Sequence, residues 1–128
     1  MGVRTLKELD AYRLSVEFKG AVYGLVRGSA HASVDHRYRD QLFDAVLSAS
    51  ANIAEGFGRR TTKDFCQFLA YARGSVAEAI TRLEDGIDRG HFTLQACQDA
   101  ITLGQRTAAA IAGLQRSLRP FLGTPTRR

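Results

Sequence analysis

Residues Ser48 to Arg60, which read SASANIAEGFGRR, decide the predicted fold. They end an apolar stripe with helical spacing, made of Leu42, Val46, Ala49 and Ile53. A polar stripe runs beside it, made of Ser48, Asn52 and Glu55. Gly56 and Gly58 are expected to end this helix, and the basic pair Arg59-Arg60 precedes the next one. The stretch therefore predicts a helix, a tight basic turn and a second helix packed against the first.

The composition is that of one globular domain, predicted to span residues 1–128. The chain is 45% hydrophobic and 24% charged. Its formal charge of +5 favours anionic partners such as nucleic acid. No apolar run approaches the length of a membrane span, and the start lacks the apolar region of a signal peptide. We expect no membrane contact, a cytoplasmic location and reduced side chains at Cys66 and Cys97.

Four long helices are expected. The first spans residues 6–27, a polar loop covers 28–33, and the second helix spans 35–55 with Ser33 or Asp35 as its N-cap. Thr61 and Asp64 resemble a capping box for the third helix, which Gly90 ends. The fourth helix starts after Thr93 and ends at Pro120. No stretch alternates with period two, so we predict an all-α fold, an antiparallel up-down-up-down four-helix bundle. A more open helical array is the alternative.

The first and last helices carry their own apolar stripes. In the first helix, one predicted face holds Leu14, Phe18, Ala21 and Leu25, widened by Val22. A second, nearly opposite face holds Leu9, Tyr12, Val16 and Tyr23, which either meets a second subunit or leaves the tyrosines at the surface. In the fourth helix, the predicted core stripe holds Leu94, Cys97, Ile101, Ala108, Ile111, Leu114 and Leu118, with Gly104 in the gap.

Two motifs carry a resemblance to a known family. They are Asn-Ile-Ala-Glu-Gly at residues 52–56 and Gly-Ser-x-x-Glu at residues 74–78. With them the chain resembles, over nearly its whole length, the proteins named for intervening sequences in bacterial 23S ribosomal RNA genes. The resemblance implies an antiparallel four-helix bundle that assembles as a homopentamer. It also implies kinship with an accessory protein of diversity-generating retroelements, which partners a reverse transcriptase and binds nucleic acid.

The sequence departs from that family after Gln41-Leu42. Relatives usually carry basic residues there, whereas this chain has Phe43 and Asp44. If those basic residues bind phosphate in relatives, part of that surface is lost here.

Polar residues of the second and third helices are expected to face one another. The predicted polar clamp consists of Ser48, Asn52, Glu55, Ser75 and Glu78. It either fixes the register of the two helices, forms a ligand or subunit-interface site, or bridges a metal. The metal alternative is disfavoured because no histidine stands three residues after a glutamate, as di-iron bundles require.

Basic residues form a second set. Arg59, Arg60 and Lys63 flank the start of the third helix, where the helix dipole favours anions. The alternative is a solvated loop. The hypothetical nucleic-acid-binding residues are Arg59, Arg60, Lys63, Arg73, Arg116 and Arg119. Further arginines (Arg106, Arg127 and Arg128) enrich the C-terminal part, which ends in a tail expected to be frayed, about 120–128.

No enzyme signature, phosphate-binding glycine loop or zinc-spaced cluster stands out, so we expect no catalysis and no cofactor. The predicted function is that of a non-enzymatic oligomeric protein, a nucleic-acid-binding or accessory factor. Its expected partners are copies of itself in a pentamer, RNA or DNA, and a reverse transcriptase or another protein. The alternative is a protein-binding scaffold without nucleic-acid affinity.

Overall fold

The computed structural model describes residues 4–126, and within them every regular element is a helix. The sole β-type pairing in that range is an isolated bridge between Thr61 and Pro125. The all-α prediction is confirmed. The elements are η1 (Leu6–Glu8), α1 (Asp10–Arg27), α2 (Ala30–Val34), α3 (His36–Phe57), α4 (Thr62–Asp88), α5 (Leu94–Leu118) and η2 (Arg119–Phe121). None of these described helices is both long and apolar enough to span a bilayer.

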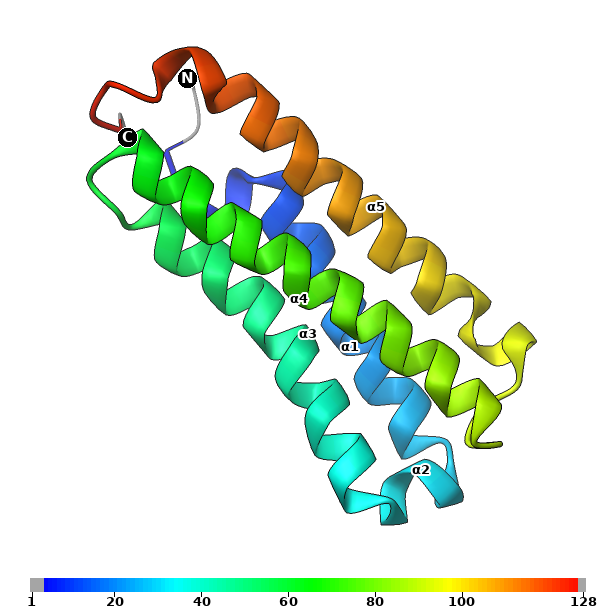
Figure 1. The fold of residues 1–128 in the computed structure, drawn as a ribbon. Coiled ribbons are helices and arrows are strands. Elements are labelled where there is room, and N and C mark those ends of the chain that lie inside the picture. The colour runs from blue at the N-terminus through cyan, green and yellow to red at the C-terminus, as the bar shows by residue number, and fades with distance from the viewer. Residues whose placement is uncertain (1–3, 127–128) are drawn as a thin grey trace.

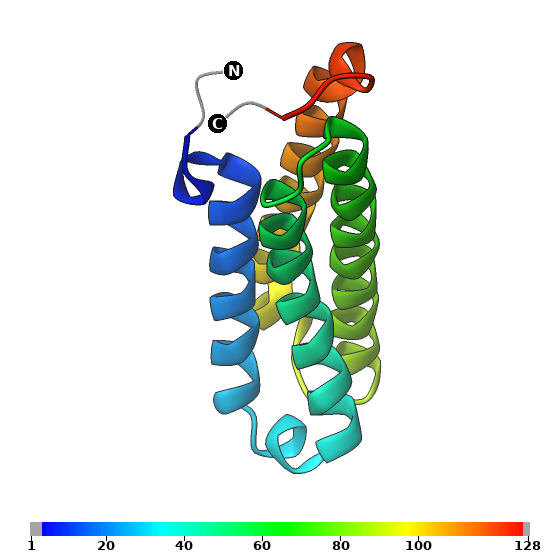
Figure 2. The same ribbon diagram turned by 90° about the vertical axis from the view of Figure 1, so that its left-hand side faces the viewer.

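The long helices α1, α3, α4 and α5 lie alongside one another (Figures 1 and 2), and the short α2 joins α1 to α3 at one end. Each long helix packs against two others: α1 against α3 and α5, and α4 against α3 and α5. Hydrogen bonds join Ser48 to Ser75 and Gln41 to Arg82, so residue numbers rise along α3 as they fall along α4. The two helices that carry the family motifs are therefore antiparallel neighbours.

The predicted loop at 28–33 is wrong, because that segment contains a helix. Ser29 caps α2 by accepting a hydrogen bond from the Ala32 amide at 3.1 Å. The Ser29 hydroxyl also donates to the His91 carbonyl at 2.8 Å, which ties this turn to the α4–α5 turn. The predicted first helix is also divided. It begins as the 3-10 turn η1, and the α-helix starts at Asp10.

The predicted helix caps are confirmed. Asp35 accepts from the Tyr38 amide at 3.4 Å at the start of α3. Thr61 accepts from the Asp64 amide at 3.1 Å, and Thr93 caps α5 in the same way. After α4, Gly90 has φ +83, a value that side-chain-bearing residues rarely adopt.

The core lies where the four long helices meet, but two predicted stripes need correction. In α1 the buried line is Ala11, Ser15, Phe18, Val22 and Val26, one position away from the predicted Leu14, Ala21 and Leu25, which are half-buried. Leu9, placed on the outer face, is 5% exposed. In α5, Leu94 is 60% exposed, and Thr107 takes a fully buried place by donating to the Leu103 carbonyl at 2.8 Å.

Three helical glycines mark places where helices nearly touch. A β-carbon at Gly86 would lie 2.1 Å from the Tyr38 hydroxyl, and one at Gly104 would lie 2.9 Å from the Phe18 ring. A β-carbon at Gly56 would lie 2.7 Å from that of Phe68. Gly56 was expected to end α3 but lies inside it, since the C-cap residue is Gly58. The role of Gly56 is close packing.

The C-terminal segment is not a frayed tail as far as residue 126. The Thr126 amide donates to the Arg60 carbonyl at 2.9 Å, and the Thr62 amide donates to the Thr124 carbonyl at 3.3 Å. The Thr126 hydroxyl also donates to the Arg59 carbonyl at 2.9 Å. The segment therefore fastens onto the α3–α4 turn. Of the predicted tail, Arg127 and Arg128 lie outside the described residues.

Candidate functional site

Three of the predicted clamp residues meet between α3 and α4. The hydroxyl oxygens of Ser48 and Ser75 lie 2.9 Å apart. The Asn52 side-chain amide donates to the Ser48 carbonyl at 2.8 Å and to its hydroxyl at 3.0 Å. The Ser75 hydroxyl donates back to the Tyr71 carbonyl at 3.2 Å. Because serine side chains are short, this chain of hydrogen bonds requires a close approach of the two helices and fixes their register.

The two carboxylates predicted for the clamp lie outside it. Glu55 is 58% exposed and pairs at 3.5 Å with Arg59, the residue that follows the C-cap of the same helix. Glu78 is 51% exposed and pairs with Arg82 at 3.0 Å. Arg82 in turn donates to the Gln41 side chain at 2.9 Å, so Glu78 reaches α3 only indirectly. The expected clamp is thus corrected to three uncharged residues, because carboxylates in water need no buried partner.

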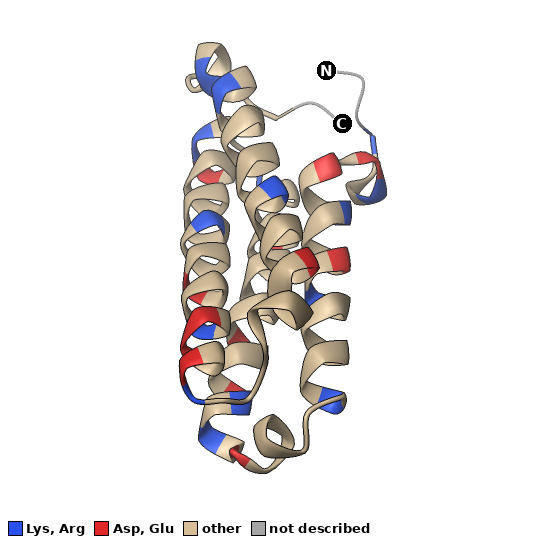
Figure 3. Ribbon diagram, turned by 90° about the vertical axis from the view of Figure 1, so that its right-hand side faces the viewer, with Lys and Arg blue, Asp and Glu red and all other residues tan. Residues whose placement is uncertain are grey.

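Five of the six predicted nucleic-acid-binding residues lie at one end of the bundle, and the sixth lies apart from them. The five lie at the end of the bundle where the α3–α4 turn meets the last turn of α5 and η2: Arg59, Arg60, Lys63, Arg116 and Arg119. We call these five the basic end. Figure 3 shows blue segments on the final turns of the chain at this end. Arg73 is exposed but lies ten residues after Lys63, roughly 15 Å along α4.

The start of α4 has fewer free amides than the sequence suggested. The Asp64 amide is bonded to the Thr61 cap, and the Thr62 amide is bonded to the C-terminal segment. An anion at this end would therefore meet side chains first. The Arg60 and Lys63 side chains are exposed and form no ion pair within residues 4–126.

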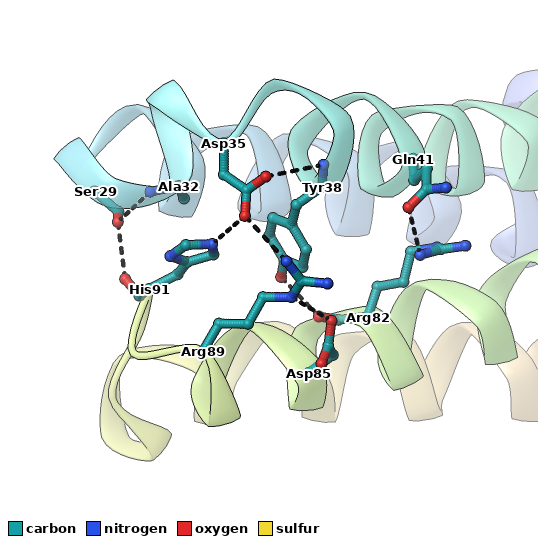
Figure 4. A network of polar contacts seen from close by, with 9 residues as sticks. All are labelled: Ser29, Ala32, Asp35, Tyr38, Gln41, Arg82, Asp85, Arg89 and His91. Carbon is teal, nitrogen blue, oxygen red and sulfur yellow. Dashed lines mark hydrogen bonds and ion pairs between the residues drawn. The ribbon is translucent and has the colours of Figure 1, made fainter.

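A network that sequence reasoning missed lies at the opposite end of the bundle (Figure 4). Its centre is one carboxylate oxygen of Asp35, which accepts from His91 at 2.8 Å and from Arg89 at 3.2 Å. Arg89 also pairs with Asp85 at 2.7 Å. The buried Tyr38 hydroxyl donates to the Arg82 carbonyl at 2.6 Å. The network joins the start of α3 to the end of α4 and the loop that follows.

The charges of this network support one another. The hydrogen bond from His91 holds the pKa of the Asp35 carboxyl below its ordinary value of 3.8, with help from the Tyr38 amide and the Arg89 charge. The hydrogen bond and charge of Asp85 raise the pKa of Arg89. Burial raises the pKa of Tyr38. Since a carboxylate only accepts, His91 must carry a proton on Nε2, and its buried Nδ1 has no partner among the described residues.

The lowered pKa predicts a pH-dependent stability. Asp35 stabilises the fold at pH values above 3.8, and this stabilisation is lost as the pH falls through the lower pKa of the folded state. Asp35→Asn keeps a capping side chain but removes the charge. We expect the variant to be less stable than the parent at neutral pH, and the difference to shrink toward pH 3 in urea titrations. Asp44→Asn, on the exposed side of α3, is the control for the loss of one negative charge from the same helix.

Metal and thiol chemistry receive no structural support from the described residues. No group of three or more His, Cys, Asp or Glu side chains in residues 4–126 is arranged to hold a metal ion. Cys66 and Cys97 are both free thiols, and burial raises the pKa of each, which disfavours the reactive thiolate.

Sequence reasoning found the caps but not their cross-helix partners. Asp35 was identified only as a capping residue, although Gly90-His91 after α4 already indicated a constrained turn. The departure at Phe43 has a structural explanation, because its ring packs edge to face on Tyr23 of α1 with centroids 4.7 Å apart. At this position, where the family resemblance led us to expect a basic residue, the chain makes an aromatic contact between α1 and α3.

These features define a class of protein: a small helical bundle with a hydrogen-bonded α3–α4 pair, a charged network at one end and a basic surface at the other. The chain belongs to the family of 23S rRNA-intervening sequence proteins, whose family model matches residues 7–113. The match covers both motifs and confirms the resemblance to this family. No curated protein matches the sequence.

Proposed function

We propose that the protein is a non-enzymatic, homo-oligomeric accessory factor that binds nucleic acid through its basic end in the cytoplasm. Its working unit is an antiparallel up-down-up-down four-helix bundle. The observation that carries the proposal is the gathering of Arg59, Arg60 and Lys63 with Arg116 and Arg119 at one end of the bundle. Phosphate backbones bind such clusters by displacing counterions, whatever the base sequence.

Oligomerisation would increase the number of phosphate contacts that the basic ends make with one nucleic acid. A single basic end contributes few phosphate contacts, but a ring of five copies, as the family resemblance implies, would present it five times to one polyanion. Linked contacts of this kind raise the overall affinity without any new interaction. A reverse transcriptase that handles the same nucleic acid is the proposed protein partner, because the family resemblance implies kinship with an accessory protein of diversity-generating retroelements.

Neutralising two charges tests the proposal. Arg60→Gln with Lys63→Gln should weaken binding to RNA, single-stranded DNA and duplex DNA, and should reduce the slope of log affinity against log salt by about 1–2. The matched control is Arg27→Gln with Arg37→Gln, two exposed arginines on α1 and α3 near the other end of the bundle. Fluorescence anisotropy across salt concentrations is the measurement, with light scattering on the same sample to compare its mass with five times 14.0 kDa.

The control separates a local surface from net charge. Both variants lose two positive charges, so an equal loss of affinity in the two would mean that the basic end has no special role. Binding that is absent at low salt, or that does not respond to salt, would contradict the proposal.

A protein-binding scaffold is the second candidate, favoured by large apolar side chains left at the surface. Leu47 on α3 is 50% exposed, Val34 is 72% exposed and Leu94 is 60% exposed. Such side chains suit a partner protein better than a phosphate backbone. A protein that co-purifies without nucleic acid, and is released by Leu47→Lys, would favour this function over the first.

A further inference from the structure

An exposed aromatic ring lies on α4 eight residues after Lys63 of the basic end, roughly 12 Å along the helix axis. Tyr71 on α4 is 50% exposed, and its ring meets Phe68 edge to face, with centroids 5.6 Å apart and planes at 86°. Because the rings are nearly perpendicular, Phe68 can cover at most one face of Tyr71. Half of the Tyr71 side chain is exposed, which leaves ring surface accessible to a planar ligand.

The ring next to it is firmly held. Phe68 is half-buried, and its β-carbon lies against Gly56, where no side chain could fit. The guanidinium carbon of Arg59 lies 4.6 Å from the centre of the Phe68 ring. Arg59, Phe68 and Tyr71 therefore form a continuous row, which leads from the basic turn along the first turns of α4.

The charges around this row favour an anion only modestly. Arg59, Arg60 and Lys63 are the nearby cations, while Glu55 pairs with Arg59 at 3.5 Å and Asp64 lies in the first turn of α4. The two carboxylates therefore offset part of the electrostatic attraction that the three cations exert on an anion. A ligand gains most here if it brings both a flat apolar face and a phosphate.

We propose that Tyr71 is a base-stacking platform for single-stranded nucleic acid, with the phosphates beside the stacked base held by the Arg59–Lys63 turn. The inference rests on the proposed function and names its substrate class. Aromatic side chains next to basic ones bind single strands because every base offers a π-face. In a duplex the bases are already stacked inside the helix, so only its phosphates could reach this surface.

A single tryptophan can report the contact directly. The chain contains no tryptophan, so Tyr71→Trp introduces one fluorophore at the proposed platform. A labelled deoxythymidine oligonucleotide reports binding by anisotropy, and tryptophan emission reports stacking. We expect the emission to be quenched at the concentration where the oligonucleotide binds. A duplex of the same length should bind through its phosphates without quenching.

Substitutions at the same position separate stacking from hydrophobicity. Tyr71→Phe keeps the π-face and should bind as the parent does. Tyr71→Leu keeps apolar area without a ring and should bind single strands about 5- to 150-fold more weakly, with duplex binding unchanged. Glu55→Gln frees Arg59 from its ion pair and should tighten binding about two- to fivefold.

The outcomes distinguish the two proposals. Salt-sensitive binding without quenching, together with unchanged binding by Tyr71→Leu, would overturn the stacking platform and leave nucleic-acid binding by the basic end intact. Equal quenching by single strand and duplex would overturn the preference for single strands. No binding to any oligonucleotide at low salt would overturn both proposals.

Discussion

Gly86→Ala will lower the free energy of unfolding by about 3 kcal/mol. The new methyl group would lie 2.1 Å from the Tyr38 hydroxyl and 2.8 Å from the Phe92 ring. Tyr38 cannot easily move away, because it is 2% exposed and its hydroxyl is bonded to the Arg82 carbonyl at 2.6 Å. The overpacking outweighs the roughly 1 kcal/mol that alanine gains over glycine inside a helix. Urea unfolding followed by circular dichroism measures the difference.

Two further variants test whether the close contact at Gly86 causes this loss of stability. Gly74→Ala on the same helix has open space around its β-carbon, so it should be stabilising by about 0.5–1 kcal/mol. Tyr38→Phe removes the atom closest to the new methyl group. The double variant with Gly86→Ala should therefore be more stable than the sum of the single effects implies. Equal changes for Gly86→Ala and Gly74→Ala would contradict the close approach.

Phe18→Ala will destabilise the protein by about 3–5 kcal/mol. The Phe18 side chain is fully buried at the contact of α1 with α5, where its ring would lie 2.9 Å from a β-carbon at Gly104. Removing the ring leaves a cavity between two helices that are held apart by their other contacts. Thermal and urea unfolding of the variant measure the loss.

An exchange of size between the two positions is the control. Gly104→Ala alone overpacks the contact, since its methyl group would also lie 3.0 Å from Ile80. Phe18→Leu alone leaves a gap. The double variant should be more stable than the sum of the two single effects implies, because the new methyl group occupies part of the space that the Phe18 ring vacates. Strict additivity would mean that Phe18 and Gly104 do not share one packing site.

Local chemistry explains which parts of the fold could be predicted. The caps at Thr61 and Thr93 depend on residues three positions away, so the sequence alone identifies them. The face of α1 could not be predicted in the same way. Ser15 lies in the core with its hydroxyl bonded to the Tyr12 carbonyl at 2.6 Å, and a hydropathy pattern does not anticipate such a satisfied polar residue. The short α2 has too few residues to show a stripe.

In the candidate sites, too, the sequence predicts contacts within one helix but not contacts between distant segments. Ser48 and Asn52 are four residues apart on one helix, so their contact follows from helical spacing. The hydrogen bond of His91 with Asp35 spans 56 residues, and only the packing of α3 against the α4–α5 turn brings them together. Glu55 was assigned to the clamp on spacing alone, but it lies on the solvent side of the polar stripe. Contacts between distant segments depend on helix rotation, which the sequence pattern does not determine.

The fastening of residues 124–126 onto the α3–α4 turn affects the order in which the protein is completed during synthesis. The backbone carbonyls of Arg59 and Arg60 obtain their partner, Thr126, only after more than sixty further residues have been added to the chain. A chain that stops before residue 124 has no residues to supply these bonds at the turn. The surface that carries Arg59, Arg60 and Lys63 therefore reaches its final shape only after residues 124–126 have been synthesised.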